Sequence, residues 1–149
     1  MLRTTGAVIA GYVVVFILVF TMFTAAFLAL GTNATYQPGT YDVSMLWIVI
    51  STILGFVAAV GGGFVAGLID KTGRGVTGLA GFMFLAGILL AIAALMMPNP
   101  AANEPRPENV ANLEAMAKSQ TPHWINFLNP FIGAAGAIVG GRLRRPAQG

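Results

Sequence analysis

Residues 6–30 read GAVIAGYVVVFILVFTMFTAAFLAL, a stretch of 25 residues without a charged side chain. A helix of about 20 apolar residues crosses the roughly 30 Å hydrocarbon core of a bilayer, so this stretch predicts a transmembrane helix. A cleaved signal peptide is the alternative, because Arg3 precedes the stretch, but the apolar part of a signal peptide has only about 7 to 15 residues. The composition agrees with a membrane protein, since 9% of the 149 residues are charged and the mean hydropathy is +0.79.

Three more apolar runs follow, over residues 44–69, 76–97 and 123–143. Pro98 and Pro100 end the third run, because proline cannot continue a helix. We therefore predict an all-α fold, a polytopic bundle of four transmembrane helices that forms a single membrane domain over residues 1–149. In the extracytoplasmic loop 98–122, residues 108–118 predict a short helix that lies on the end of the bundle or on the membrane surface, or that docks a partner.

The basic residues predict the orientation of the chain. Six of the eight Lys and Arg residues flank the first span, the turn at residues 70–75 and the end of the last span, whereas Arg106 and Lys118 lie in the loops on the opposite side. The positive-inside rule then puts both termini of this multi-pass protein in the cytoplasm. The formal net charge of +3 forms no single patch, so we expect the lipid bilayer and no nucleic acid as a partner.

Small residues recur at every fourth position in the second and fourth runs. Such a stripe lies near one helix face and lets backbones approach closely, which is how helices associate in lipid. It predicts a helix-packing seam, either within this one bundle or with a second copy or another subunit. The predicted seam consists of Gly55, Ala59, Gly63, Gly67, Gly133, Ala137 and Gly141.

Polar residues at the start of the fourth run form a candidate polar site of His123, Asn126 and Asn129. The two asparagines share a helix face, and Pro130 frees a backbone carbonyl one turn earlier. The alternative is that they make ordinary hydrogen bonds between helices, with His123 and Trp124 as an anchor at the membrane interface.

At the other end of this run, three arginines predict a site for lipid headgroups: Arg142, Arg144 and Arg145. The chain has no cysteine and one histidine, so we expect no metal site and no cofactor.

The two halves of the chain show a faint similarity. Residues 10–12 (AGY) match residues 80–82 (AGF), and residues 64–69 (FVAGLI) match residues 138–143 (IVGGRL). The matches predict a tandem helical hairpin with a pseudo-twofold axis along the membrane normal. Chance similarity among small and apolar residues is the alternative.

Two Gly-rich stretches carry a resemblance to known proteins: GGGFVAGLIDKTGRGVTGLAGFMFLAGILL at residues 61–90 and GAAGAIVGGRLRR at residues 133–145. They resemble a group of small bacterial integral membrane proteins with four Gly-rich helices and no assigned activity. The resemblance implies a bundle in a bacterial inner membrane and brings no catalytic residues. The long segment over residues 99–122 departs from that group, in which this loop is often short.

The apolar cores of the spans contain no Asp, Glu, Lys or Arg, which disfavours proton-coupled transport and intramembrane catalysis. We therefore expect no catalytic residues and a non-enzymatic structural or accessory subunit, which packs against a partner subunit or as a homo-oligomer. The alternative is a small passive channel or carrier for a neutral or lipid-like solute. Its lining would be Asn126, Asn129, Thr21 and Thr24.

Overall fold

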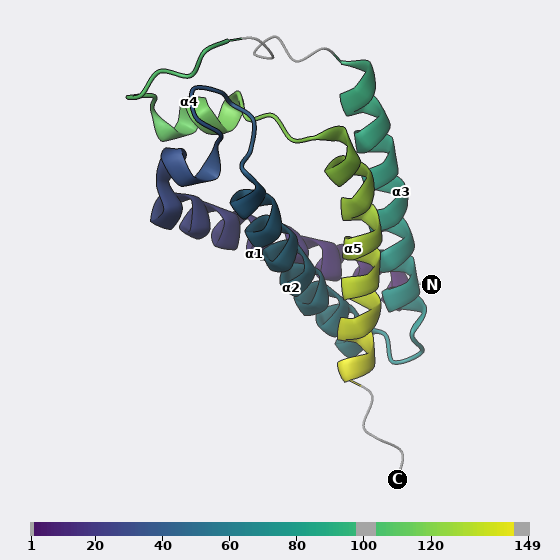
Figure 1. Cartoon of the computed structure of the whole chain (residues 1–149). Helices are drawn as coiled ribbons and strands as arrows, with labels where there is room; N and C mark the ends of the chain where they lie inside the picture. The colour runs from purple at the N-terminus through teal and green to yellow at the C-terminus, as the bar shows by residue number, and fades with distance from the viewer. Residues whose placement is uncertain (1, 98–103, 145–149) are drawn as a thin grey trace.

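The computed structural model describes residues 2–97 and 104–144, and these residues form five helices (Figure 1). The all-α class is therefore confirmed for the described part of the chain. The predicted stop at Pro98 and Pro100 lies outside the described residues. The helices are α1 Leu2–Thr35, α2 Met45–Ile69, α3 Arg74–Met96, α4 Asn112–Ala117 and α5 His123–Leu143.

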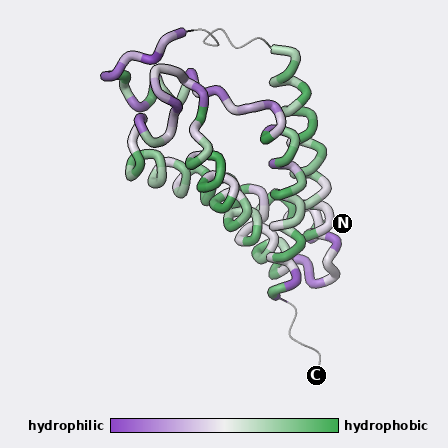
Figure 2. The backbone as a smooth tube through the Cα atoms, viewed as in Figure 1, coloured by the Kyte–Doolittle hydropathy of each residue, from purple (hydrophilic) through white to green (hydrophobic). Residues whose placement is uncertain are grey.

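Three of these helices, α1, α2 and α3, are each long and apolar enough to cross a membrane, as expected of a multi-pass membrane protein. The helix α5 has 21 residues but is less apolar, because asparagines and glycines replace large apolar side chains in it. Hydrophobic residues dominate the long helices in Figure 2, whereas hydrophilic residues gather at the two ends of the molecule.

The long helices pack in a definite order, in which α2 lies against α1 and α5, and α3 lies against α5 and α1. α1 and α5 make no close backbone contact along their described lengths. The start of α1, the turn from α2 to α3 and the end of α5 meet at one end of the molecule, which we call the basic end. It follows that α2 and α5 both run toward the basic end, whereas α1 and α3 both run away from it (Figure 1).

Local sequence signals set the ends of the helices. Gly31 breaks the helical path of α1 with φ 72° and ψ 171°, a conformation that favours glycine. The break falls directly after the predicted first span. The Ser44 side chain accepts a hydrogen bond from the backbone N–H of Trp47 and caps α2. Gly73, at φ 82°, turns the chain into α3.

Two separate cores hold the helices together. Near the basic end the buried cluster consists mainly of small side chains, among them Ala7, Ala66, Ala80 and Ala137, around Leu79. At the opposite end the cluster is aromatic and includes Phe27, Tyr36, Tyr41, Ile48 and Ile125. The helices therefore approach closely at the basic end, and large side chains fill the space between segments at the other.

Direct backbone contact between α2 and α5 is the closest approach in the fold. A side-chain carbon added at Gly63 would overlap the backbone of Ala137, and one added at Gly140 would overlap the carbonyl of Val60. Lipid provides little hydrophobic drive for helix pairing, so dispersion contacts at this distance stabilise the pair instead. The contact requires glycine at both positions.

We predict that Gly63→Ala destabilises the protein by about 2 kcal/mol, because the new methyl group forces α2 and α5 apart. Gly81→Ala is the matched control, since Gly81 lies on α3 with no atom within 4 Å of an added carbon, and alanine favours helix. Thermal unfolding in a mild detergent measures both. Equal stability of the two variants would contradict the close contact.

Candidate functional site

In the structure, the residues of the predicted small-residue seam contact different helices of the chain. On α2, Ala59 and Gly63 face α5, where Ala59 lies 2.7 Å from a carbon added at Gly136, whereas Gly55 faces Phe23 of α1. A four-residue step advances about 400° around a helix, so the stripe drifts by about 40° at each step.

The same drift operates on α5, where Ala137 faces α2. Gly133 and Gly141 instead face Met83 and Val76 of α3. Near the basic end, a carbon added at Gly67 would lie 3.5 Å from Gly141. Each of these contacts is made within the chain itself.

Asp70 joins three segments at the basic end. It is only 4% exposed and caps α2. Its carboxylate accepts hydrogen bonds from the Thr72 hydroxyl at 2.6 Å, the Thr72 N–H at 3.0 Å, the Thr4 hydroxyl at 3.0 Å and the Gly75 N–H at 2.9 Å. The two Thr72 bonds, with those from Thr4 and Gly75, lower the pKa of Asp70 to about 2 although burial opposes them. Asp70 therefore fixes the start of α1 to the turn between α2 and α3.

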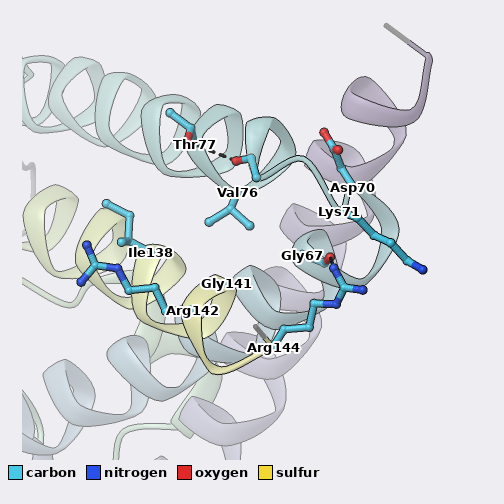
Figure 3. A pocket seen from close by; sticks show the side chains of 10 residues that line it. Gly67, Asp70, Lys71, Val76, Thr77, Ile138, Gly141, Arg142 and Arg144 are labelled. Carbon is cyan, nitrogen blue, oxygen red and sulfur yellow. Dashed lines mark hydrogen bonds between the residues drawn. The ribbon is translucent and has the colours of Figure 1, made fainter. Parts of the chain in front are cut away.

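A hollow of about 260 Å³ opens at the basic end between α3 and α5 (Figure 3). Val76 and Ile138 form apolar parts of its wall, and Lys71, Thr77 and Arg142 contribute polar groups. Of the arginines predicted to hold lipid headgroups, Arg142 and Arg144 line this hollow. The third, Arg145, lies outside the described residues.

Arg144 has a specific partner in the structure. Its Nη1 donates a hydrogen bond of 2.5 Å to the carbonyl oxygen of Gly67, which belongs to the last turn of α2. The last carbonyls of a helix lack partners within the helix and carry partial negative charge, so a cation there is favourable. Arg144 therefore caps α2 and ties the end of α5 to it.

The candidate polar site is split in the structure. Asn126 and Asn129 line a hollow of about 300 Å³ between α3 and α5, which is otherwise lined mainly by apolar residues such as Met83 and Leu90. His123 does not line it and is exposed at the first turn of α5 beside the exposed Trp124. The structure thus brings the two asparagines together without the histidine.

The threonines expected to complete a channel lining lie elsewhere. Thr21 and Thr24 belong to α1, and the described backbones of α1 and α5 make no close contact. The four polar residues therefore do not converge on one lining.

A folded cap covers the end opposite the basic end. It comprises residues 36–44 and 104–122, and the two segments are linked by hydrogen bonds from Val43 N–H to the Gln120 carbonyl at 3.0 Å and from Gln120 N–H to the Tyr41 carbonyl at 2.9 Å. The Tyr36 hydroxyl donates to the Ala115 carbonyl at 2.9 Å, and burial raises the pKa of Tyr36. The helix α4 is shorter than the predicted 108–118.

Two cationic side chains make specific contacts within the cap. Arg106 is 8% exposed, donates from Nε to the Thr40 carbonyl at 2.9 Å, and lies 5.7 Å from the ring centre of Tyr36. Lys118 pairs with Glu104 at 2.8 Å and Glu114 at 3.2 Å. Hydrogen bonds to these two carboxylates raise the pKa of Lys118.

Sequence reasoning did not find Asp70, Tyr36 or Arg106 as organising residues. The Arg106 contact with Thr40 joins residues 66 positions apart, and no periodic pattern predicts such a contact. A signal existed for Asp70, because an acidic residue directly after an apolar run and before Thr72 and Gly73 is typical of a side-chain-capped turn.

The described residues contain no group of three or more histidine, aspartate or glutamate side chains suited to a metal ion. No family model, no curated protein and no solved structure matches this chain. Its function must therefore be argued from its own residues.

We predict that the Asp70 hydrogen bonds make stability depend on acid pH. The folded pKa of about 2 lies below the ordinary value of about 3.9, so the stabilisation is complete above about pH 5 and is lost as the pH falls toward 2. Asp70→Asn should lower the unfolding temperature at pH 7 and reduce its fall between pH 5 and pH 2. Asp42→Asn, at an exposed cap residue, is the control. An unchanged pH profile in Asp70→Asn would refute this role.

Proposed function

We propose that the chain is a non-enzymatic membrane subunit that packs against another membrane protein or a second copy of itself. The observation that carries this proposal is the exposed apolar face of α4. Leu113 is 80% exposed and Met116 is 42% exposed, whereas Ala115 of the same helix is fully buried in the cap. Internal hydrogen bonds and ion pairs already order this cap, so a partner could bind the two side chains at little cost in conformational entropy.

The proposal includes a fourth span, α5, and the orientation predicted from the charges. The 21 residues of α5 extend about 31 Å as a helix, enough for the hydrocarbon core. Its contact with the full-length span α2 supports the same depth in the membrane. Arg144 bonding to Gly67 and Thr4 bonding to Asp70 support one common side for the basic segments. We propose that this side is the cytoplasm of a bacterial cell.

A tandem helical hairpin is also part of the proposal. Tyr12 and Phe82, which are equivalent in the predicted repeat, have ring centres 5.0 Å apart. Gly63 lies against Ala137 and Gly67 lies beside Gly141, and both pairs keep the spacing of the second match. Residues related by a pseudo-twofold axis meet where the axis passes between them, so contacts between equivalents support this relation.

We predict that the double variant Leu113→Gln/Met116→Gln lowers the yield of co-purified partner at least about tenfold. The stability of the variant should not change, because both side chains are exposed. The measurement is purification of the full chain from native membranes in a mild detergent, with the mass and composition of the intact complex. Met45→Gln, which changes a side chain that is 66% exposed at the start of α2, is the control. A lone wild-type monomer, or a double variant that retains its partner, would contradict the proposal.

A second candidate function, a carrier for a lipid-like solute, is favoured by the hollow beside Asn126 and Asn129. Two amides in an apolar groove offer hydrogen bonds to a neutral polar group and contacts to an acyl chain. We expect Asn126→Ala/Asn129→Ala to reduce transfer of a fluorescent diacylglycerol between vesicles about tenfold. Thr21→Ala/Thr24→Ala is the control and should retain transfer. Equal transfer by the wild type and both variants would exclude this candidate.

A further inference from the structure

The hollow at the basic end lies where apolar helix surface meets charged side chains. Val76 and Ile138 contribute apolar surface, and Lys71 and Arg142 carry positive charge. The described part of this end holds five cationic side chains and a single carboxylate, that of Asp70. The five are Arg3, Lys71, Arg74, Arg142 and Arg144.

Some charged side chains at the basic end already have hydrogen-bond or ion-pair partners within the chain, and others do not. Asp70 accepts four hydrogen bonds from neighbouring groups. Arg144 bonds to the Gly67 carbonyl. Within the described residues, the ion pairs involve Lys118 alone, so Lys71 and Arg142 have no carboxylate partner there.

Lys71 and Arg142 flank the hollow from different elements. Lys71 belongs to the turn between α2 and α3, and Arg142 belongs to the last turn of α5 (Figure 3). Figure 3 draws the charged ends of both side chains pointing outward from the hollow. Both residues are exposed, so their long side chains can reorient toward an anion. The Thr77 hydroxyl, which bonds to the Gly73 carbonyl at 3.2 Å, adds an oxygen that can contact a ligand.

We propose that this hollow binds the headgroup phosphate of an anionic phospholipid, with Lys71 and Arg142 as its cationic contacts. A phosphate complements the unpaired positive charge and accepts charge-assisted hydrogen bonds from both residues. The lipid's acyl chain contacts Val76 and Ile138, which free phosphate cannot do. Basic pockets between membrane helices bind anionic headgroups for the same physical reasons.

The test measures lipid retention on the purified full chain in a neutral detergent. Native mass spectrometry follows a titration with phosphatidylglycerol, and phosphatidylcholine serves as the zwitterionic reference. We expect Lys71→Gln/Arg142→Gln to weaken phosphatidylglycerol binding about thirtyfold, because the variant loses the attraction of two basic residues to the headgroup. Arg3→Gln/Arg74→Gln removes the same charge from the same end without changing a residue that lines the hollow. This control should weaken binding less than about threefold.

Equal weakening by both double variants would overturn the proposal, because diffuse charge would then explain the binding. Equal retention of the two lipids by the wild type would also overturn it. Displacement of phosphatidylglycerol by an equal concentration of inorganic phosphate would assign the hollow to free phosphate instead of lipid.

A further variant, Thr77→Phe, keeps every charge, and its exposed position allows the ring to fill the hollow. It should weaken phosphatidylglycerol binding at least about fivefold, and unchanged binding would refute the site.

Discussion

Contact between the backbones of α2 and α5 is the constraint on which the rest of the fold depends. Gly63 lies against the backbone of Ala137, and Gly140 lies against the carbonyl of Val60. Lipid chains are as apolar as leucine, so helices in a membrane gain little from hiding apolar side chains from one another. Close approach of this kind fixes the position of α5 along the axis of α2. That register brings Arg144 to the last turn of α2, where it bonds to Gly67.

Different interactions stabilise the cap, because it lies outside the apolar spans and its buried polar groups need hydrogen-bond partners. Aromatic rings, a buried arginine and backbone hydrogen bonds hold its two segments together. Tyr36 shows the combination, since its ring packs 6.1 Å from that of Phe27 while its hydroxyl bonds to the Ala115 carbonyl. A buried phenol needs such a partner. Small residues therefore organise the basic end and large amphipathic residues organise the cap.

The sequence predicts the helices well because each apolar run is long and ends at a clear signal. The observed α2 and α5 begin and end within one residue of the predicted 44–69 and 123–143. The prediction of α4 was too long, since the structure starts it at Asn112, after Pro105 and Pro107. Residues 108 and 109 form a turn instead of the first helical turn, and Asn109 is a residue type that favours turns over helix interiors.

Contacts between distant segments follow less directly from sequence. The stripe of small residues indicates that α2 and α5 approach something closely, but its spacing does not say which helix. Drift of about 40° at each step then sends Gly55 to α1 and Gly133 to α3. His123 is the first residue of α5 and is exposed there, beyond the hollow that the two asparagines line. Asp70 shows the opposite case, in which a carboxylate next to an apolar run serves internal structure. Its bonds to Thr4, Thr72 and Gly75 leave it little capacity to bind anything else. The cations beside the hollow and the exposed apolar side chains of α4, by contrast, lie at opposite ends of the molecule.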